Sequence, residues 1–281
     1  MKDSSSESSI SLLRATFFNK YKIIEKIGEG SFGRVYKAEY NNTFYAVKLE
    51  ERDGKKGLLK NEGEILYKLK GPNIPKVESL GTSGKYNVLI MQLLGKSLED
   101  IFEERRQFSL NTICQLAVQM INTLEYIHNL HYIHRDMKPD NFAMGINDLN
   151  YQVYLIDFGL AKLYRSPRTL IQNPMVIKKK LTGTARYASI NALKGVEQSR
   201  RDDLEGLAYV LLYLLRGNLP WQGLQAKNKE ERYKKILDIK MKTSCQELCY
   251  GYPKELSDFL YYTKYLEYTE DPDYEKCRNL F

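Results

Sequence analysis

The chain of 281 residues is 43% hydrophobic and 28% charged, which describes an ordinary soluble protein with a core in one large domain or two lobes. Its 43 basic and 35 acidic residues give a net charge of +8, which favours acidic or phosphorylated partners, with nucleic acid as the competing explanation. The most apolar stretch, residues 207–215, has about half the length that a bilayer requires, so we expect no membrane span.

Two further features bear on compartment and domain limits. Residues 1–16 contain a serine-rich run with little to pack, so we expect a flexible tail followed by one folded domain over residues 17–281. The cysteines are far apart except for one pair that has no histidine nearby, which favours reduced thiols over disulfides or zinc. They are Cys114, Cys245, Cys249 and Cys277.

The first predicted strand, residues 21–27, runs into a glycine triplet at Gly28, Gly30 and Gly33. Glycines let backbone amides approach a phosphate chain without a Cβ in the way, and Val35 can close over a flat base. A plain hairpin turn is the alternative for this stretch taken alone. A Rossmann site is excluded, because the chain after the third glycine continues as an alternating strand instead of a helix.

The next predicted strand, residues 43–49, carries Lys48 near its middle, where burial would be costly without an anionic partner. A lysine reaching out from a strand edge is the alternative. Residues 57–70 have apolar side chains at helical spacing, with Glu62 and Glu64 among them. We expect Glu62 to face Lys48, and Glu64 is the second candidate.

A strand over residues 86–91 leads into an extended linker, residues 92–98, after which the composition shifts towards helices. Ser109 can cap a helix that ends near Asn129. Histidines recur at positions 128, 131 and 134, but the helix ends before the last two, and no set of carboxylates is available to complete a zinc site. We expect the last of them, His134, to be packed and hydrogen-bonded beside the loop that follows.

The strongest chemical signal is the loop from His134 to Asn141, followed after an apolar run by Asp157. Two aspartates and an asparagine separated by a short hairpin can converge on one polyphosphate. One carboxylate, from Asp136, would face an incoming hydroxyl, while the asparagine and the second carboxylate bind hard divalent cations through oxygen. This is the chemistry of phosphoryl transfer.

Together, these motifs resemble a eukaryotic protein kinase. The matching set is Gly28-x-Gly30-x-x-Gly33-x-Val35, Ala46-Val47-Lys48, Glu62, His134-Arg135-Asp136-x-Lys138-x-x-Asn141 and Asp157-Phe158-Gly159. Four further blocks are similar to the casein kinase 1 family, and the resemblance covers residues 18–281. The blocks are residues 94–100, 181–191, 197–205 and 219–224, of which the second holds Ser189-Ile190-Asn191 where most protein kinases have Ala-Pro-Glu.

The resemblance implies an α+β, two-lobed protein-kinase fold: an antiparallel sheet with one main helix over residues 17–91, the linker over 92–98 and a mainly helical lobe over 99–281. Asp136 would accept the proton of a substrate hydroxyl, Lys138 would steady the phosphoryl group, and Asn141 with Asp157 would hold Mg²⁺. ATP would bind at a set drawn from the first lobe and the start of the linker. Its members are Ile27, Gly28, Glu29, Gly30, Ser31, Phe32, Gly33, Arg34, Val35, Ala46, Lys48, Glu62, Met91, Gln92 and Leu93.

The resemblance also implies a substrate preference, because guanidinium groups bind phosphate bidentately. We expect protein substrates with acidic or already phosphorylated Ser/Thr sites, captured by basic residues around the activation segment and by an anion site. The first group is Arg135, Lys162 and Lys179, and the second is Arg186, Gln222, Gly223 and Arg232.

Some positions depart from the family pattern. Gln92 stands where glutamate is common, and Arg232 and Gln225 stand where lysines are frequent, which puts fine specificity in doubt. Residues 228–235 dilute the lysine-rich stretch linked to nuclear entry, so we expect a cytoplasmic protein with weak support for a nuclear pool. The sequence ends at Phe281, before the regulatory tail of many relatives, either because it is trimmed or because the protein is short; without such a tail we expect a constitutively active monomer. A nucleotide-binding scaffold without catalysis is the alternative, and the dispersed tyrosines argue against nucleic-acid binding.

Overall fold

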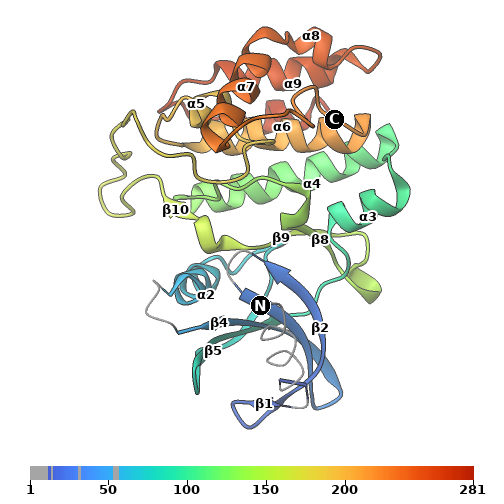
Figure 1. The fold of residues 1–281 in the computed structure, drawn as a ribbon, viewed down its shortest axis with the longest axis vertical. Coiled ribbons are helices and arrows are strands. Elements are labelled where there is room, and N and C mark those ends of the chain that lie inside the picture. The colour runs from blue at the N-terminus through green and yellow to red at the C-terminus, as the bar shows by residue number, and fades with distance from the viewer. Residues whose placement is uncertain (1–11, 14, 31–32, 53–56) are drawn as a thin grey trace. The chain divides into compact units, whose positions relative to one another are not determined.

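The computed structural model describes residues 12–13, 15–30, 33–52 and 57–281 (Figure 1). The chain divides into two compact units. The N-unit comprises Met1–Gly95, Gly145–Asn150 and Ile156–Gly159, and the C-unit comprises Lys96–Met144, Tyr151–Leu155 and Leu160–Phe281. The boundary after Gly95 lies inside the expected linker, whereas the two later segments of the N-unit come from the range expected in the second lobe.

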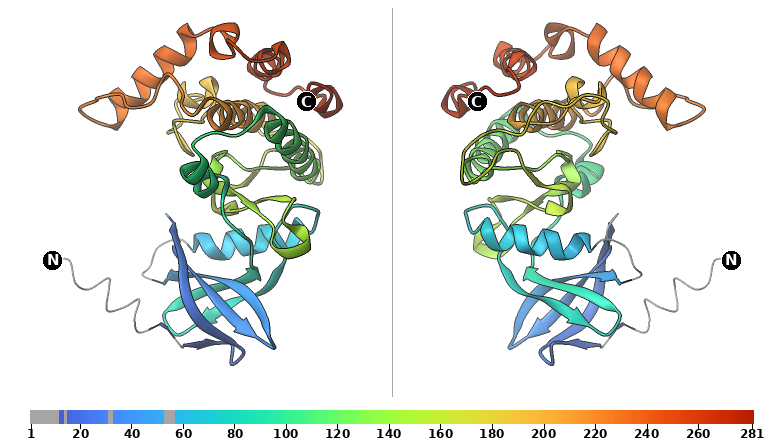
Figure 2. Two further views of the ribbon diagram at one scale, coloured as in Figure 1. Left: turned by 90° about the vertical axis from the view of Figure 1, so that its right-hand side faces the viewer. Right: turned by 90° about the vertical axis from the view of Figure 1, so that its left-hand side faces the viewer.

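The N-unit is built on one antiparallel sheet in the order β1-β2-β3-β4-β6-β5 (Figures 1 and 2). Its strands are β1 (Thr16–Phe17), β2 (Tyr21–Gly30), β3 (Gly33–Tyr40), β4 (Thr43–Glu51), β5 (Val77–Ser83) and β6 (Tyr86–Gln92). Helix α2 (Leu58–Lys68) packs on β4, β5 and β6. The strands and the helix predicted from residues 21–27, 43–49, 57–70 and 86–91 are therefore confirmed.

Strand alternation gives this sheet two different faces. Tyr36, Val47 and Ile90 are fully buried and belong to the hydrophobic core of one face. Leu12 joins the same core, so the segment expected to be a flexible tail includes packed residues at its end. Ala46 and Lys48 alternate with the core residues of β4 and therefore point to the other face, where α2 packs.

The C-unit is mainly helical, with α6 almost completely buried and packed against α4 and α9. The Ser109 side chain accepts the Thr112 N–H at the start of α4, which confirms the predicted cap. The helices are α3 (Leu98–Arg105), α4 (Leu110–Asn129), α5 (Ile190–Leu193), α6 (Arg200–Arg216), α7 (Lys229–Lys242), α8 (Cys245–Leu248), α9 (Lys254–Tyr265) and α10 (Tyr274–Arg278). The antiparallel sheet of the N-unit and the helices of the C-unit together confirm the predicted α+β fold.

Short elements between α4 and α5 carry the loops of interest. They are β7 (Tyr132–Ile133), η1 (Pro139–Asn141), β8 (Phe142–Met144), η2 (Asn147–Leu149), β9 (Val153–Leu155), η3 (Phe158–Leu160) and β10 (Lys162–Leu163). Strand β8 pairs with β9, and β10 pairs with β7. In the described part of the chain, no helix combines the length and apolar character that crossing a bilayer would take.

Candidate functional site

The glycine triplet lies where β2 turns back into β3, with Gly30 opposite Gly33. Gly33 has φ +153°, and a Cβ there would lie 2.2 Å from the carbonyl oxygen of Leu49, so packing against β4 requires glycine. Among the described residues, a Cβ on Gly28 would meet only Val35, at 3.9 Å. Packing within the described part of the chain therefore does not require glycine at position 28, which is consistent with a glycine kept for close approach of a ligand.

The remaining hairpin residues of the predicted nucleotide set have varied surroundings. Ile27 is 46% exposed, Glu29 pairs with Lys26 and the Arg34 guanidinium pairs with Glu51 at 2.8 Å. The other two predicted members, Ser31 and Phe32, lie outside the described residues.

Strand register gathers four of the predicted nucleotide residues on the face opposite the core. Val35 pairs with Lys48 across β3 and β4, and Ala46 pairs with Met91 across β4 and β6. Gln92 follows at the end of β6, where its N–H donates to the carbonyl oxygen of Lys76 at 2.8 Å. Its amide N–H is thus committed to the main chain of its own unit. Leu93 and Gln92 also line a pocket of about 370 Å³ in the N-unit.

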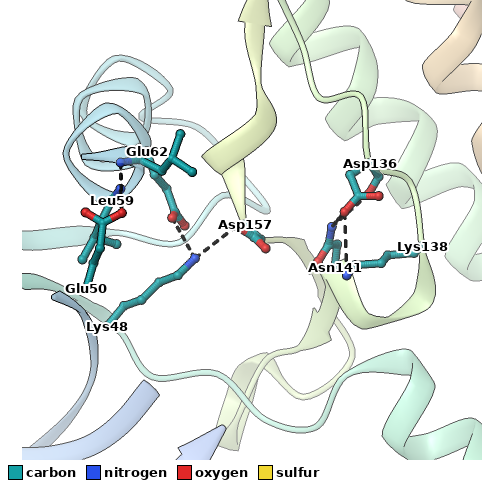
Figure 3. A network of polar contacts seen from close by, with 9 residues as sticks. Lys48, Glu50, Leu59, Glu62, Asp136, Lys138, Asn141 and Asp157 are labelled. Atoms are coloured by element: carbon teal, nitrogen blue, oxygen red, sulfur yellow. Dashed lines mark hydrogen bonds and ion pairs between the residues drawn. The ribbon is translucent and has the colours of Figure 1, made fainter. Parts of the chain in front are cut away.

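Lys48 binds two carboxylates, as Figure 3 shows. Its Nζ lies 2.7 Å from Oε2 of Glu62 and 3.1 Å from Oδ1 of Asp157. Burial favours the neutral amine, but the two carboxylates outweigh burial and raise the pKa of Lys48, so the ammonium stays charged. The pairing with Glu62 is confirmed. Glu64, the second candidate for this pairing, was wrong: its side chain is exposed, and its Oε1 lies 3.9 Å from Nζ of Lys60.

Strand β4 also fixes the helix that carries Glu62. The Glu50 carboxylate accepts the N–H groups of Leu58 at 3.0 Å and Leu59 at 3.4 Å, the first residues of α2 (Figure 3). Asn87 holds the second oxygen of Glu50 at 2.8 Å. A carboxylate at a helix N-terminus satisfies orphan donors and the helix dipole. Sequence reasoning missed Glu50, although its position two residues after Lys48 places it on the same face.

In the C-unit, Asp136 lies in the loop between β7 and η1 with both carboxylate oxygens engaged. Asn141 Nδ2 donates to its carbonyl oxygen at 2.9 Å and to Oδ2 at 3.3 Å, and the Thr184 hydroxyl donates to Oδ1 at 2.8 Å. Lys138 Nζ lies 3.7 Å from Oδ2 (Figure 3). Asp136 is 8% exposed, and its carboxylate is held from two sides. Sequence reasoning missed Thr184.

A buried aspartate of α6, Asp203, braces this loop. It accepts the N–H groups of His134 at 2.7 Å and Arg135 at 2.8 Å, and His128 Nε2 lies 3.0 Å away. Burial opposes the charge, but these donors outweigh it and lower the pKa of Asp203. His134 is fully buried, which confirms the predicted packed, bonded histidine. The available signal for Asp203 was a carboxylate at the edge of the apolar stretch of α6.

The predicted basic residues form two separate clusters in the C-unit. Lys162 and Lys179 both pair with the buried Glu197, the first at 2.9 Å. Arg135 donates through Nε to the carbonyl oxygen of Leu160 at 2.8 Å. This cluster thus contains an unforeseen carboxylate, which reduces its positive charge and lowers its capacity for anions.

The second cluster lines one pocket of about 410 Å³. The predicted anion residues Arg186, Gln222, Gly223 and Arg232 are all in its lining. Lys138, Glu99 and Asp140 line it as well, so the lining carries three cationic and two acidic side chains. Burial raises the pKa of Glu99, and its hydrogen bond with the Tyr213 hydroxyl partly offsets this effect.

Comparison with known families agrees with this geometry. The family model described as "Protein kinase domain" matches residues 21–267, which is most of the chain.

Proposed function

Since this chain belongs to the protein kinase family, we propose that it is a serine/threonine kinase of the casein kinase 1 type, with ATP and Mg²⁺ as cofactors. The observation that supports this proposal best is the arrangement around Asp136. Thr184 and Asn141 hold its two carboxylate oxygens, so the side chain is fixed before any substrate arrives. Fixed geometry is what a group needs in order to orient a hydroxyl for attack.

In this proposal Asp136 orients the substrate hydroxyl and accepts its proton as the oxygen attacks the γ-phosphorus. Lys138, beside Asp136, places a positive charge near the group in transfer. The Lys48 ammonium, kept charged by Glu62 and Asp157, binds the α- and β-phosphates. Positioning and charge neutralisation then supply most of the rate, since little covalent chemistry falls to the protein.

The side chains available for Mg²⁺ suit that ion. Asn141 directs its amide nitrogen at Asp136, so its amide oxygen is the group left for a cation. Asp157 offers a carboxylate whose Oδ1 also contacts Lys48. Oxygen donors are the ligands that Mg²⁺ prefers, and the bound ion would neutralise charge on the polyphosphate. The proposal requires that the two units present these two residues to one ion.

The excess of cationic over acidic side chains in the 410 Å³ pocket supports a preference for acidic or phosphorylated substrates. Arg186 and Arg232 can bind a phosphate on the substrate through paired N–H groups. Activity without a phosphorylated activation segment is supported by the contacts of Lys48 and Asp136, which unmodified side chains already make.

Transfer of radiolabelled phosphate from ATP to casein and to a phosphorylated peptide tests the proposal, with wild type compared with Asp136→Asn. We expect labelled serine or threonine with wild type and a loss of at least about 100-fold with the variant. Asp238→Asn, at an exposed position of α7, is the matched control and should retain activity. A well-folded wild type that binds ATP but labels no acceptor would make the chain a nucleotide-binding scaffold. Labelled tyrosine would contradict the serine/threonine assignment.

A further inference from the structure

Helix α7 buries a lysine whose role the reaction scheme above does not use. Lys240 is 1% exposed, and its Nζ lies 4.1 Å from the ring centre of Tyr209 and 4.7 Å from that of Trp221. It donates to the carbonyl oxygens of Ala188 and, at 3.4 Å, Ala185. Lys240 is thus enclosed by aromatic rings and main-chain carbonyls inside the C-unit.

Stability alone does not explain such a residue. Burial lowers the pKa of the Lys240 amine to about 7, an effect that the Glu205 carboxylate only partly offsets and that Lys264 reinforces. Taking an ammonium out of water is costly, and buried charges are often replaced by apolar side chains of similar volume without loss of stability. A use in positioning would account for keeping the lysine.

The carbonyls that Lys240 binds belong to the segment that carries the substrate groups. Thr184, one residue before Ala185, holds Asp136, and Arg186 lines the anion pocket. The carbonyl oxygen of Arg186 itself accepts the Trp221 Nε1–H at 2.6 Å. Main-chain carbonyls at positions 185, 186 and 188 are therefore held by two side chains, of which Lys240 is buried outside the pocket lining and Trp221 is part of it.

We propose that Lys240, together with Trp221, is a positioning residue that sets selectivity for phosphorylated substrates by fixing the main chain of residues 185–188. The consequence is a fixed guanidinium at Arg186, which packs on the Tyr187 and Tyr213 rings at 5.7 and 5.6 Å. This inference rests on the proposed function, because it concerns the substrate preference of the same site.

The test compares kcat/KM for a phosphorylated peptide with kcat/KM for the same peptide without its phosphate, in wild type and Lys240→Met. The ratio of the two values does not depend on how much of the enzyme is folded, so a merely structural role leaves it unchanged. We expect the ratio to fall about tenfold, the worth of one hydrogen bond to a charged group. Lys234→Met, at an exposed position of the same helix, should keep the wild-type ratio.

A second variant decides the matter if Lys240→Met yields no folded protein. Trp221→Phe keeps a ring beside Lys240 but removes the N–H that binds the Arg186 carbonyl, and it should lower the same ratio. Unchanged ratios in the folded variants would overturn the inference while leaving the kinase assignment intact. A wild-type ratio near one would instead show that the proposed preference for phosphorylated substrates is wrong, and the inference would fall with it.

Discussion

Replacing Lys48 by methionine should strongly destabilise the N-unit, because the substitution leaves a buried carboxylate without its cation. Glu62 is 1% exposed, and among the described residues its Oε1 has no hydrogen-bond partner, so Oε2 depends on Lys48. Breaking a buried ion pair by removing one partner costs about 3–5 kcal/mol. Asp157, whose side chain is 22% exposed, adds little because water can reach it. Circular dichroism should show an unfolding midpoint lowered by roughly 6–20 °C.

A double-mutant cycle separates the burial of Glu62 from other effects of the lysine. Lys48→Met combined with Glu62→Met removes both charges, so we expect most of the lost stability to return, although nucleotide binding should not. Lys60→Met is the control: its ion pair with Glu64 is exposed and 3.9 Å long, and its loss should cost under about 0.5 kcal/mol. A single Lys48 variant as stable as wild type, or a double variant as unstable as the single one, would refute the reasoning.

Three further experiments test other parts of the structure. Thr184→Val removes the hydroxyl bonded to Asp136 and should lower kcat about tenfold with an unchanged KM for ATP, whereas Thr184→Ser should restore the rate; equal steady-state rates in all three would contradict the role. Burial raises the pKa of Asp202 from 3.8 to about 7, so the folded protein holds a proton between these values and loses stability as the pH rises through this window. The unfolding midpoint of Asp202→Asn, relative to that of wild type, should therefore rise between pH 5 and pH 8. Midpoints that change in parallel with pH in the two proteins would show that the carboxyl does not titrate there. Gly33→Ala should lower the unfolding midpoint, while Gly28→Ala should leave it unchanged and weaken ADP binding in calorimetry; the reverse pattern would contradict the division between the two glycines.

Much of the N-unit could be predicted because its local signals agree with its packing. The strand that holds Lys48 is rich in β-branched and aromatic residues, and its alternation separates core from functional face. The pairing with Glu62 followed from the cost of burying a lone ammonium, a rule that needs no coordinates. The choice between Glu62 and Glu64 needed helix phase, since only one of the two points at the sheet.

The unpredicted residues act across long sequence separations. Thr184 reaches Asp136 across 48 residues and Asp203 reaches the loop at His134 across 69, and no local pattern indicates either contact. At Glu197 the expectation from sequence failed in another way. Lys162 and Lys179 were predicted to bind anions, but both form ion pairs with the buried carboxylate of Glu197, 18 residues beyond Lys179. Counting basic residues along a chain overlooks acids that folding brings among them.

Backbone strain at the site explains a further limit of sequence reasoning. Asp157 has φ +62° and Arg135 has φ +70°, a region that glycine or asparagine normally fills. Such a conformation costs about 1–3 kcal/mol and persists only where surrounding contacts determine it. Arg135 is held by the bond from its N–H to Asp203, and Asp157 has its carboxylate on Lys48. A main-chain hydrogen bond at Arg135 and a side-chain ion pair at Asp157 thus outweigh the local backbone preference. Residues that no propensity would select for these turns are therefore where the chain gives up local stability for chemistry.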